Sequence, residues 1–341
     1  MTVHTAEISV KGKWVRVPAL EVEGRTIIVN GKWIKVALID AEEWLETGLE
    51  DPEPCLKKLK EQRSSELRAD LFTFAQRVSN PAPRYKYPME MESIAAVRLT
   101  TFDNWWQNLP QETRKNTRRS QKRGVVVRVQ QLDASLIKDI LTLNNDSSVR
   151  QGKPFSHYGK TLEQVTKDQA AFLDRSEYIC AYLGDELVGF AKLVFRKEVA
   201  SILTFLPKAS HYDKRPANAL MTKLVERCTE RQISYLTYGL FNYGNKQDAP
   251  LREFKVRNGF GEILVPRFYV PLTVKGALCM KLNLHRGLIG ILPPSVIALG
   301  GKVRTKWYNT KLSMRRCSSM TERPNRTRQM ECSNPPAGSN S

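Results

Sequence analysis

The sequence predicts an α+β fold in which helices flank a mixed central sheet and a small N-terminal β-rich module comes first. Two apolar runs, Tyr178–Leu183 and Leu187–Phe195, flank a Gly-Asp-Glu turn, which is typical of a β-hairpin. A third apolar run, Val199–Leu206, follows them, and Ile233–Gly239 is strand-like again. Between these strands, apolar residues recur at the spacing of one helix face: Ala217, Leu220, Met221, Leu224, Val225 and Cys228.

The first 50 residues are predicted to form the β-rich module. The segments VKGKWVRV (10–17) and VNGKWIKV (29–36) are near-copies, each with a glycine turn ahead of an alternating strand. Two copies are too few for a repeat protein, so we expect a β-meander or an internal duplication. Trp14 and Trp33 could stack on a base or a sugar, but we expect them in the module's core.

Breaks in composition divide the rest of the chain. Residues 51–92 are predicted to hold a helix over Leu56–Val78 and a proline-rich linker at Asn80–Pro88. The remaining segments are a main domain over 93–275, a C-terminal helical segment over 276–310 and a disordered basic tail over 311–341.

The charge is strongly basic. A net charge of +19, from 54 Lys and Arg against 35 Asp and Glu, makes RNA, phosphorylated metabolites or an anionic membrane face plausible partners. No apolar run is long enough for a transmembrane segment, and the chain does not start with the apolar core of a secretory signal. The six cysteines include no C-x-x-C pair, so we expect a reducing, cytoplasmic location.

One predicted helix, Gln111–Arg123, is basic and has almost no apolar face. Its candidate substrate-binding residues are Arg114, Arg118, Arg119 and Lys122. Two interpretations stay open, because such a helix either binds an anionic ligand or simply presents a solvated surface.

The loop Ser148–Lys160 concentrates polar and basic residues. Loops between packed elements often carry binding and catalytic groups. Because imidazole titrates near neutrality, His157 is our candidate proton acceptor, with Tyr158 beside it. Arg150, Gln151 and Lys160 are candidate substrate contacts in the same loop. A histidine without a catalytic role is the alternative.

Four segments resemble Fem-type transferases and the wider Gcn5-related N-acetyltransferase (GNAT) superfamily. They are LPQETRKNTRRSQKRGVVVRV (109–129), GDELVGFAKLVF (184–195), DKRPANALMTKLVERCTERQISYLTYG (213–239) and LREFKVRNGFG (251–261). They are similar to the family's basic helix and strand, its hairpin, its loop, helix and strand, and its closing corner. The order of these elements over Ser93–Leu272 carries the resemblance. It implies transfer of an acyl or aminoacyl group to an amine, in cell-envelope or surface-polymer synthesis.

The resemblance also implies a donor site. The donor would be acyl-CoA or aminoacyl-tRNA, with no metal, and its phosphates would lie at the loop before the central helix and at the N-terminus of that helix. The residues placed there are Lys208, Lys214, Arg215 and Asn218.

The sequence departs from the family pattern in several ways. The loop has no glycine, Pro216 removes one backbone donor, and the last helix reads Glu253-Phe254-Lys255 where a tyrosine acid is usual. The strand Val199–Leu206 carries no carboxylate. Two alternatives to an enzyme therefore stay open. One is a non-catalytic RNA-binding protein, and the other is a structural protein of an envelope assembly whose C-terminal apolar stretch lies on a membrane.

Overall fold

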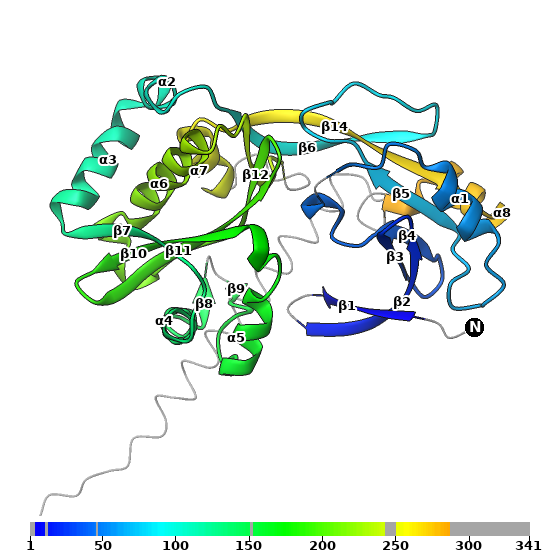
Figure 1. The fold of residues 1–341 in the computed structure, drawn as a ribbon, viewed down its shortest axis with the longest axis horizontal. Coiled ribbons are helices and arrows are strands. Elements are labelled where there is room, and N and C mark those ends of the chain that lie inside the picture. The colour runs from blue at the N-terminus through cyan, green and yellow to red at the C-terminus, as the bar shows by residue number, and fades with distance from the viewer. Residues whose placement is uncertain (1–3, 11–12, 46, 151–152, 243–249, 287–341) are drawn as a thin grey trace, which may run out of the picture. The chain divides into compact units, whose positions relative to one another are not determined.

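The computed structural model describes residues 4–10, 13–45, 47–150, 153–242 and 250–286 (Figure 1). The chain divides into two units, Met1–Leu282 and Asn283–Ser341. Helix α8 (Val274–Lys281) lies where the C-terminal helical segment is expected to begin. The rest of that segment after residue 286 and the tail 311–341 lie outside the described residues.

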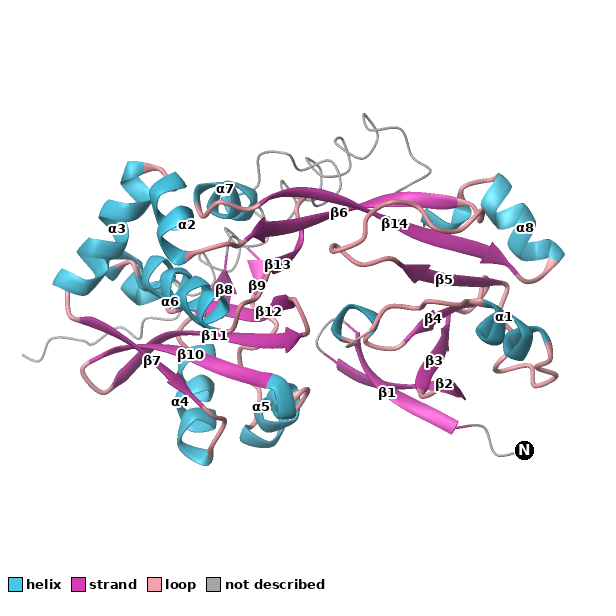
Figure 2. Ribbon diagram, turned by 45° about the horizontal axis from the view of Figure 1, so that its top comes forward, coloured by secondary structure: helices cyan, strands magenta, loops and turns pink. Residues whose placement is uncertain are grey.

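The described part of the first unit contains one mixed sheet of twelve strands, flanked by helices, as the sequence predicts (Figures 1 and 2). All of its strand pairs are antiparallel except β4–β5 and β12–β13. In spatial order the strands are β1 (His4–Val10), β2 (Lys13–Val22), β3 (Arg25–Asn30), β4 (Val36–Ile39), β5 (Leu71–Ala75), β14 (Gly261–Pro271), β6 (Met89–Arg98), β13 (Tyr235–Leu240), β12 (Val199–Pro207), β11 (Glu186–Arg196), β10 (Ser176–Leu183) and β7 (Val125–Gln130).

Seven further helices and four short 3₁₀ turns complete the described chain, with a small β8–β9 pair. The helices are α1 (Glu53–Lys60), α2 (Phe102–Asn108), α3 (Gln111–Lys122), α4 (Ala134–Asn144), α5 (Leu162–Gln169), α6 (Pro216–Glu230) and α7 (Pro250–Arg257). The short elements are η1 (Glu42–Trp44), η2 (Leu173–Arg175), η3 (Ala209–Lys214), η4 (Leu284–Arg286), β8 (Val149–Arg150) and β9 (Lys153–Pro154).

The predicted hairpin is confirmed as β10–β11, with Leu183 opposite Glu186. Its strands read as continuous apolar runs because both faces are covered. Ile179 and Ala181 pack in the core that holds α6, whereas Tyr178 and Cys180 pack with α4 and α5. The sheet is thus a layer between two sets of helices in this region.

The N-terminal strands are present, but they do not sit apart. β4 pairs with β5 in parallel and β5 pairs with β14, so hydrogen bonding continues from β1 into the main sheet. The expectation that Trp14 and Trp33 are core residues is wrong, because their exposed fractions are 37% and 69%. Both lie at the ends of hairpins, where alternation does not decide which face is covered.

The helix expected over Leu56–Val78 is also wrong. Only Glu53–Lys60 is helical, and Leu71–Ala75 is a strand buried between β4 and β14. Leu71, Phe72 and Phe74 are all fully buried. A short apolar run that is covered on both faces has no alternating signal, so its periodicity does not distinguish strand from helix.

The parallel pair β12–β13 positions the site. These strands are joined only over Val199–Ser201 and Tyr235–Thr237. Beyond Thr237 they diverge, while β12 continues to Pro207 and leads through η3 into α6. The point where β12 and β13 separate lies next to β6, which pairs with β13. β6 and its other neighbour β14 are two long strands in the middle of the sheet (Figure 2).

Candidate functional site

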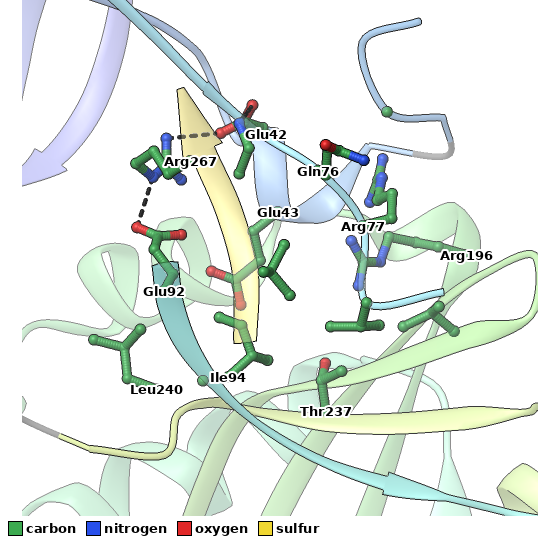
Figure 3. A pocket seen from close by; sticks show the side chains of 16 residues that line it. Glu42, Glu43, Gln76, Arg77, Glu92, Ile94, Arg196, Thr237, Leu240 and Arg267 are labelled. Atoms are coloured by element: carbon green, nitrogen blue, oxygen red, sulfur yellow. Dashed lines mark hydrogen bonds and ion pairs between the residues drawn. The ribbon is translucent and has the colours of Figure 1, made fainter. Parts of the chain in front are cut away.

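A cavity of about 340 Å³ opens where η1 faces the strands β6, β12, β13 and β14 (Figure 3). Its walls combine carboxylates and guanidinium groups over an aliphatic floor. The lining residues are Glu42, Glu43, Gly48, Ala75, Gln76, Arg77, Val78, Glu92, Ile94, Arg196, Val199, Thr237, Gly239, Leu240, Val265 and Arg267. A polar wall over an apolar floor suits a ligand that has both a charged and a hydrocarbon part.

One wall of the cavity is fixed by Arg267. Its Nε donates to Glu92 Oε1 at 2.6 Å, and its Nη1 lies 3.1 Å from Glu42 Oε2. The other oxygen of Glu42 accepts from the backbone N–H of Ala75 at 2.7 Å. Burial raises the pKa of Glu42, although Arg267 opposes the shift. Burial also acts to lower the pKa of Arg267, but Glu42 and Glu92 outweigh it and raise that pKa.

Glu43 differs from these paired carboxylates. Its side chain points into the cavity between the Arg267–Glu92 pair on one side and Arg77 and Arg196 on the other (Figure 3). The surrounding protein raises the pKa of Glu43 by desolvation, and Arg196 opposes the shift. Within the described residues Glu43 makes no hydrogen bond or ion pair, and it remains open to solvent. A carboxyl group of this kind can exchange a proton with a ligand.

The opposite wall of the cavity is tied to the two parallel strands. Arg196 Nη2 donates to Ser201 Oγ at 2.6 Å, and Ser201 Oγ lies 2.5 Å from Thr237 Oγ1. Ser201 and Thr237 are the last pair of residues that joins β12 to β13. Val199, Thr237, Gly239 and Leu240 line the cavity, so it lies against the paired part of these strands and follows β13 beyond their last pair.

Aromatic residues fill the divergence on the side of α6 and α7. Phe205 lies 5.7 Å from Tyr238 and 5.5 Å from Phe254 between ring centroids. Lys255 is fully buried beside them, with Nζ 4.6 Å from the Tyr238 ring and donating to Leu240 O at 2.7 Å. Burial lowers the pKa of Lys255 to about 8. Lys255 therefore holds the end of β13 in place next to the cavity.

The two predicted functional loops contact each other. Arg150 Nη1 donates to Pro207 O at 2.8 Å, and the guanidinium lies 4.4 Å from the centroid of the Phe155 ring. Asp146 accepts from the backbone N–H groups of Ala209 and Ser210 at 2.9 and 3.3 Å. These contacts bring the segment before His157 against η3.

His157 itself faces a different neighbour. Its Nδ1 lies 3.7 Å from Asp168 Oδ2, and Lys160 forms an ion pair with the same carboxylate. Burial and Lys160 lower the pKa of His157, while Asp168 opposes the shift. Tyr158 is exposed, and Gln151 lies outside the described residues. None of these residues lines the cavity that contains Glu43, so the catalytic role of His157 and Tyr158 stays a prediction.

The predicted donor residues lie around the N-terminus of α6. Lys208 forms an ion pair with Glu186, and Lys214 Nζ lies 3.1 Å from Asp213. Arg215 is the N-cap of α6 in a left-handed conformation, with φ 58°, and Asn218 is in the first turn. The side chains of Arg215 and Asn218 make no hydrogen bond or ion pair within the described residues. Of the four residues predicted to bind the acyl donor, these two have side chains without a hydrogen bond or ion pair to the rest of the described chain.

The basic helix α3 packs on the protein through a face of small polar residues. The sequence pattern does not mark these residues as a packing face. Thr113 Oγ1 donates to Arg257 O at 3.1 Å, and Thr117 Oγ1 lies 3.2 Å from Thr222 Oγ1 on α6. The opposite face is exposed and basic. Arg118 and Lys122 are exposed, Arg119 pairs with Glu112 at 2.9 Å, and Arg114 donates to Gln107. Arg123, just after the helix, donates to Asp213 O, so this basic face adjoins η3.

Sequence reasoning missed the residues of the cavity. Glu42 and Glu43 follow the short strand β4 after two intervening residues, and such adjacent acids after an apolar run are a usable signal. Arg196 comes from β11, near the middle of the main domain, and Arg267 comes from β14, near its end. Their convergence depends on the strand order, which the sequence pattern does not give.

The strand order and the diverging parallel pair beside a helix N-terminus define a Fem-like, GNAT-like fold. The structure is similar to that of FemX, with TM-score 0.53 and 11% identity over 82% of this chain and 90% of that chain. It is also similar to L-PGS from Bacillus licheniformis, with TM-score 0.51 and 13% identity over 80% and 89% of the two chains. At these identities the comparisons show the fold. No family model matches the sequence, and no curated protein matches it.

Two further properties of the described residues bear on the site. They contain no group of three or more His, Cys, Asp or Glu side chains that could hold a metal ion. None of the helices in the described ranges is both long enough and apolar enough to cross a bilayer.

Proposed function

We propose that this protein is an acyl- or aminoacyltransferase that uses an amine as acceptor. The observation that carries the proposal is that the cavity with the Glu43 carboxyl lies against the paired part of β12 and β13 and follows β13 past the point where the two strands separate. The amine would enter this cavity, and the donor would approach along β12 from the N-terminus of α6. The fold is that of FemX and L-PGS, which agrees with a transferase at the level of fold.

The proposed chemistry needs one base and a place for a leaving group. An amine that enters as an ammonium ion loses one proton to Glu43, and its nitrogen then attacks the acyl carbon. The new C–N bond forms as the C–S bond of a thioester or the C–O bond of an aminoacyl ester breaks. The nitrogen releases a second proton as the amide forms, the leaving sulfur or oxygen takes up that proton, and Glu43 returns the first proton to solvent. Glu43 suits this step because its raised pKa makes it a stronger base than an ordinary carboxylate.

The guanidinium groups give the cavity a second property. Arg77 and Arg196 face Glu43 across the cavity, so an acceptor with an anionic group close to its amine would meet charges of opposite sign at both ends (Figure 3). The aliphatic floor of Ile94, Val199 and Leu240 would contact its hydrocarbon part. An amino acid or peptide amine and an aminophospholipid headgroup both have this chemistry.

The length of β12 limits the kind of donor. From Ser201, where the pairing ends, to Pro207, where β12 ends, an extended strand spans about 20 Å. A donor whose phosphates rest on Lys214 and Arg215 therefore needs a long thin arm to bring its acyl carbon to the cavity. Coenzyme A has such an arm in pantetheine, and tRNA has one in its single-stranded 3′ end.

The exposed face of α3 favours aminoacyl-tRNA over acyl-CoA. Its basic residues continue from Arg123 away from η3, along a helix of 12 residues, or about 18 Å. The phosphates of a nucleic acid backbone could contact basic residues along this whole length, whereas a single pyrophosphate could contact only a small part of it. We place the reaction in cell-envelope or surface-polymer synthesis in the cytoplasm, with peripheral contact to an anionic membrane.

The same helix supports a second candidate function. A protein that binds RNA without catalysis would keep the basic face of α3 and would not need the Glu43 cavity. Incubation with labelled aminoacyl-tRNA or acetyl-CoA and a small amine such as ethanolamine separates the two. The transferase proposal expects a labelled amide that is lost in Glu43→Gln. A melting temperature raised by tRNA, with no amide formed, would instead favour the RNA-binding function.

A further inference from the structure

The outward face of α8 is apolar, although helices at a protein surface usually present polar residues there. Val274, Leu278 and Leu282 follow one another at intervals of four residues, and their exposed fractions are 88%, 54% and 52%. The opposite face of the helix is buried through Gly276 and Cys279. The exposed stripe is therefore not the face that holds α8 on the protein.

The orientation of α8 is fixed by close contacts. Thr273 caps the helix by accepting from the N–H of Gly276 at 3.0 Å, and its hydroxyl donates to Asp70 Oδ1 at 2.9 Å. A Cβ on Gly276 would lie 1.9 Å from Asp70 O, so the helix backbone approaches β5 as closely as glycine allows. The helix cannot rotate its apolar stripe inward without losing these contacts.

Trp33 extends the stripe into a patch. It lies after the tight turn at the end of β3, has an exposed fraction of 69%, and is contacted by Lys275 of α8. Lys275 Nζ lies 5.7 Å from the centroid of the Trp33 ring and donates to Trp33 O. The patch, which we call the α8 patch, consists of Trp33, Val274, Leu278 and Leu282.

The charges around the α8 patch are positive. Lys32, Lys275 and Lys281 are exposed beside it. Asp70 forms an ion pair with Lys275, with 3.4 Å between Oδ2 and Nζ, and it also accepts from the Thr273 hydroxyl and from the backbone N–H of Lys35 at 3.0 Å. Within the described chain, Lys32 and Lys281 carry the unpaired charge beside the patch. A tryptophan and aliphatic side chains with lysines around them is the composition of helices that lie in the interface of an anionic bilayer.

We infer that the α8 patch is a docking surface for an anionic phospholipid bilayer. Val274, Leu278 and Leu282 insert among the acyl chains, the Trp33 ring lies at the level of the headgroups, and the lysines contact lipid phosphates. A symmetric contact between two copies of this chain fits less well, because it would bring lysines against lysines across the interface. The inference shares no residue with the Glu43 cavity and does not depend on the proposed reaction.

The test uses the full chain and vesicles of phosphatidylcholine, with or without an equal share of phosphatidylglycerol. We expect binding to the anionic vesicles, weakened by salt, and a loss of at least about tenfold in the Val274→Asp/Leu278→Asp variant. Val256→Asp is the matched control, since Val256 is an exposed helix residue outside the patch. Lys275→Gln/Lys281→Gln should lose the preference for anionic vesicles, and Trp33→Phe should lose part of the blue shift of fluorescence on binding.

Three results would overturn the inference. If the Val274→Asp/Leu278→Asp variant binds vesicles as the wild type does, basic residues elsewhere hold the membrane. If the wild type ignores vesicles and forms a dimer that this variant dissociates, a second copy covers the patch. If the wild type ignores vesicles as a monomer, and the variant lowers its melting temperature, the patch is covered within the chain itself and does not dock on a bilayer.

Discussion

Arg267 of β14 donates to Glu92 of β6 at 2.6 Å, and this pair fixes one wall of the cavity in which the Glu43 carboxyl stands. The same guanidinium contacts Glu42 of η1 at 3.1 Å. One arginine thus satisfies two carboxylates from distant parts of the sequence. Glu43, the next residue after Glu42, is left facing the cavity.

We expect Arg267→Met to destabilise the fold. The side chains of Arg267, Glu42 and Glu92 are mostly buried, so removing the arginine leaves two carboxylates without their cation. Breaking a buried pair in this way costs about 3 kcal/mol in the free energy of unfolding. Urea unfolding measures the loss. Arg119→Met, which breaks the exposed pair with Glu112, is the matched control and should cost less than about 1 kcal/mol. Equal losses in the two variants would show that Arg267 does not stabilise this wall.

Lys192 should make stability depend on pH. Its ammonium is fully buried, donates to Gln169 O at 2.7 Å, and has its pKa lowered by burial to about 8 from 10.5. Between these two values the unfolded chain binds more protons than the folded chain, so stability rises with pH in this window. Lys192→Met should remove up to about 3 kcal/mol of this rise. Lys138→Met, at an exposed position, is the control for the change in charge, and identical curves for both variants would contradict the account.

Gly276 should tolerate no larger residue. A Cβ there meets the backbone oxygen of Asp70 at 1.9 Å, whereas a Cβ on Gly261 meets nothing within 4 Å. Gly276→Ala should therefore lower the free energy of unfolding by about 1–3 kcal/mol, as overpacking does. Gly261→Ala should be close to neutral. Thermal melting of both variants checks this, and an unchanged melting temperature in Gly276→Ala would mean that α8 does not rest on Asp70.

The sequence anticipates those parts of the fold in which local pattern and tertiary burial agree. The β10–β11 hairpin and the apolar stripe of α6 are found where predicted, because turn residues and helical spacing determine them locally. The strand Leu71–Ala75 lies in a segment whose pattern predicts a helix, since burial on both faces removes the alternation of a strand. The exposure of Trp33 was also missed, because it depends on where α8 returns to the first hairpins.

The candidate site shows the same division. Lys214, Arg215 and Asn218 could be placed together from the loop and helix that carry them. The Glu43 cavity could not, because its walls come from η1, β6, β11 and β14, which only the strand order brings together. Thr113 and Thr117 belong to a helix that is polar on all sides, so the sequence pattern does not show the face by which α3 packs on α6.

The basic face of α3 should determine how RNA binding responds to salt. Each phosphate contact that is lost should lower the log–log slope of affinity against salt by roughly 0.7–0.9. We therefore expect Arg118→Glu/Lys122→Glu to weaken binding of total tRNA and to reduce the slope by about 1.5–2. Arg63→Glu/Arg68→Glu, at exposed positions outside α3, makes the same change in net charge as a control. A slope that changes equally in both variants would assign α3 to the solvated surface.

The pH dependence of amide formation by the wild type, Glu43→Gln and His157→Ala tests the central claim most directly. If Glu43 is the base, the wild-type rate rises with pH through a value above the ordinary range of a glutamate, because the raised pKa keeps the carboxyl protonated at lower pH. Glu43→Gln should then lose about a hundredfold or more in turnover together with this rise, while His157→Ala keeps both. A rate and a pH profile that survive in Glu43→Gln, but are lost in His157→Ala, would contradict the account and return the chemistry to the loop 148–160.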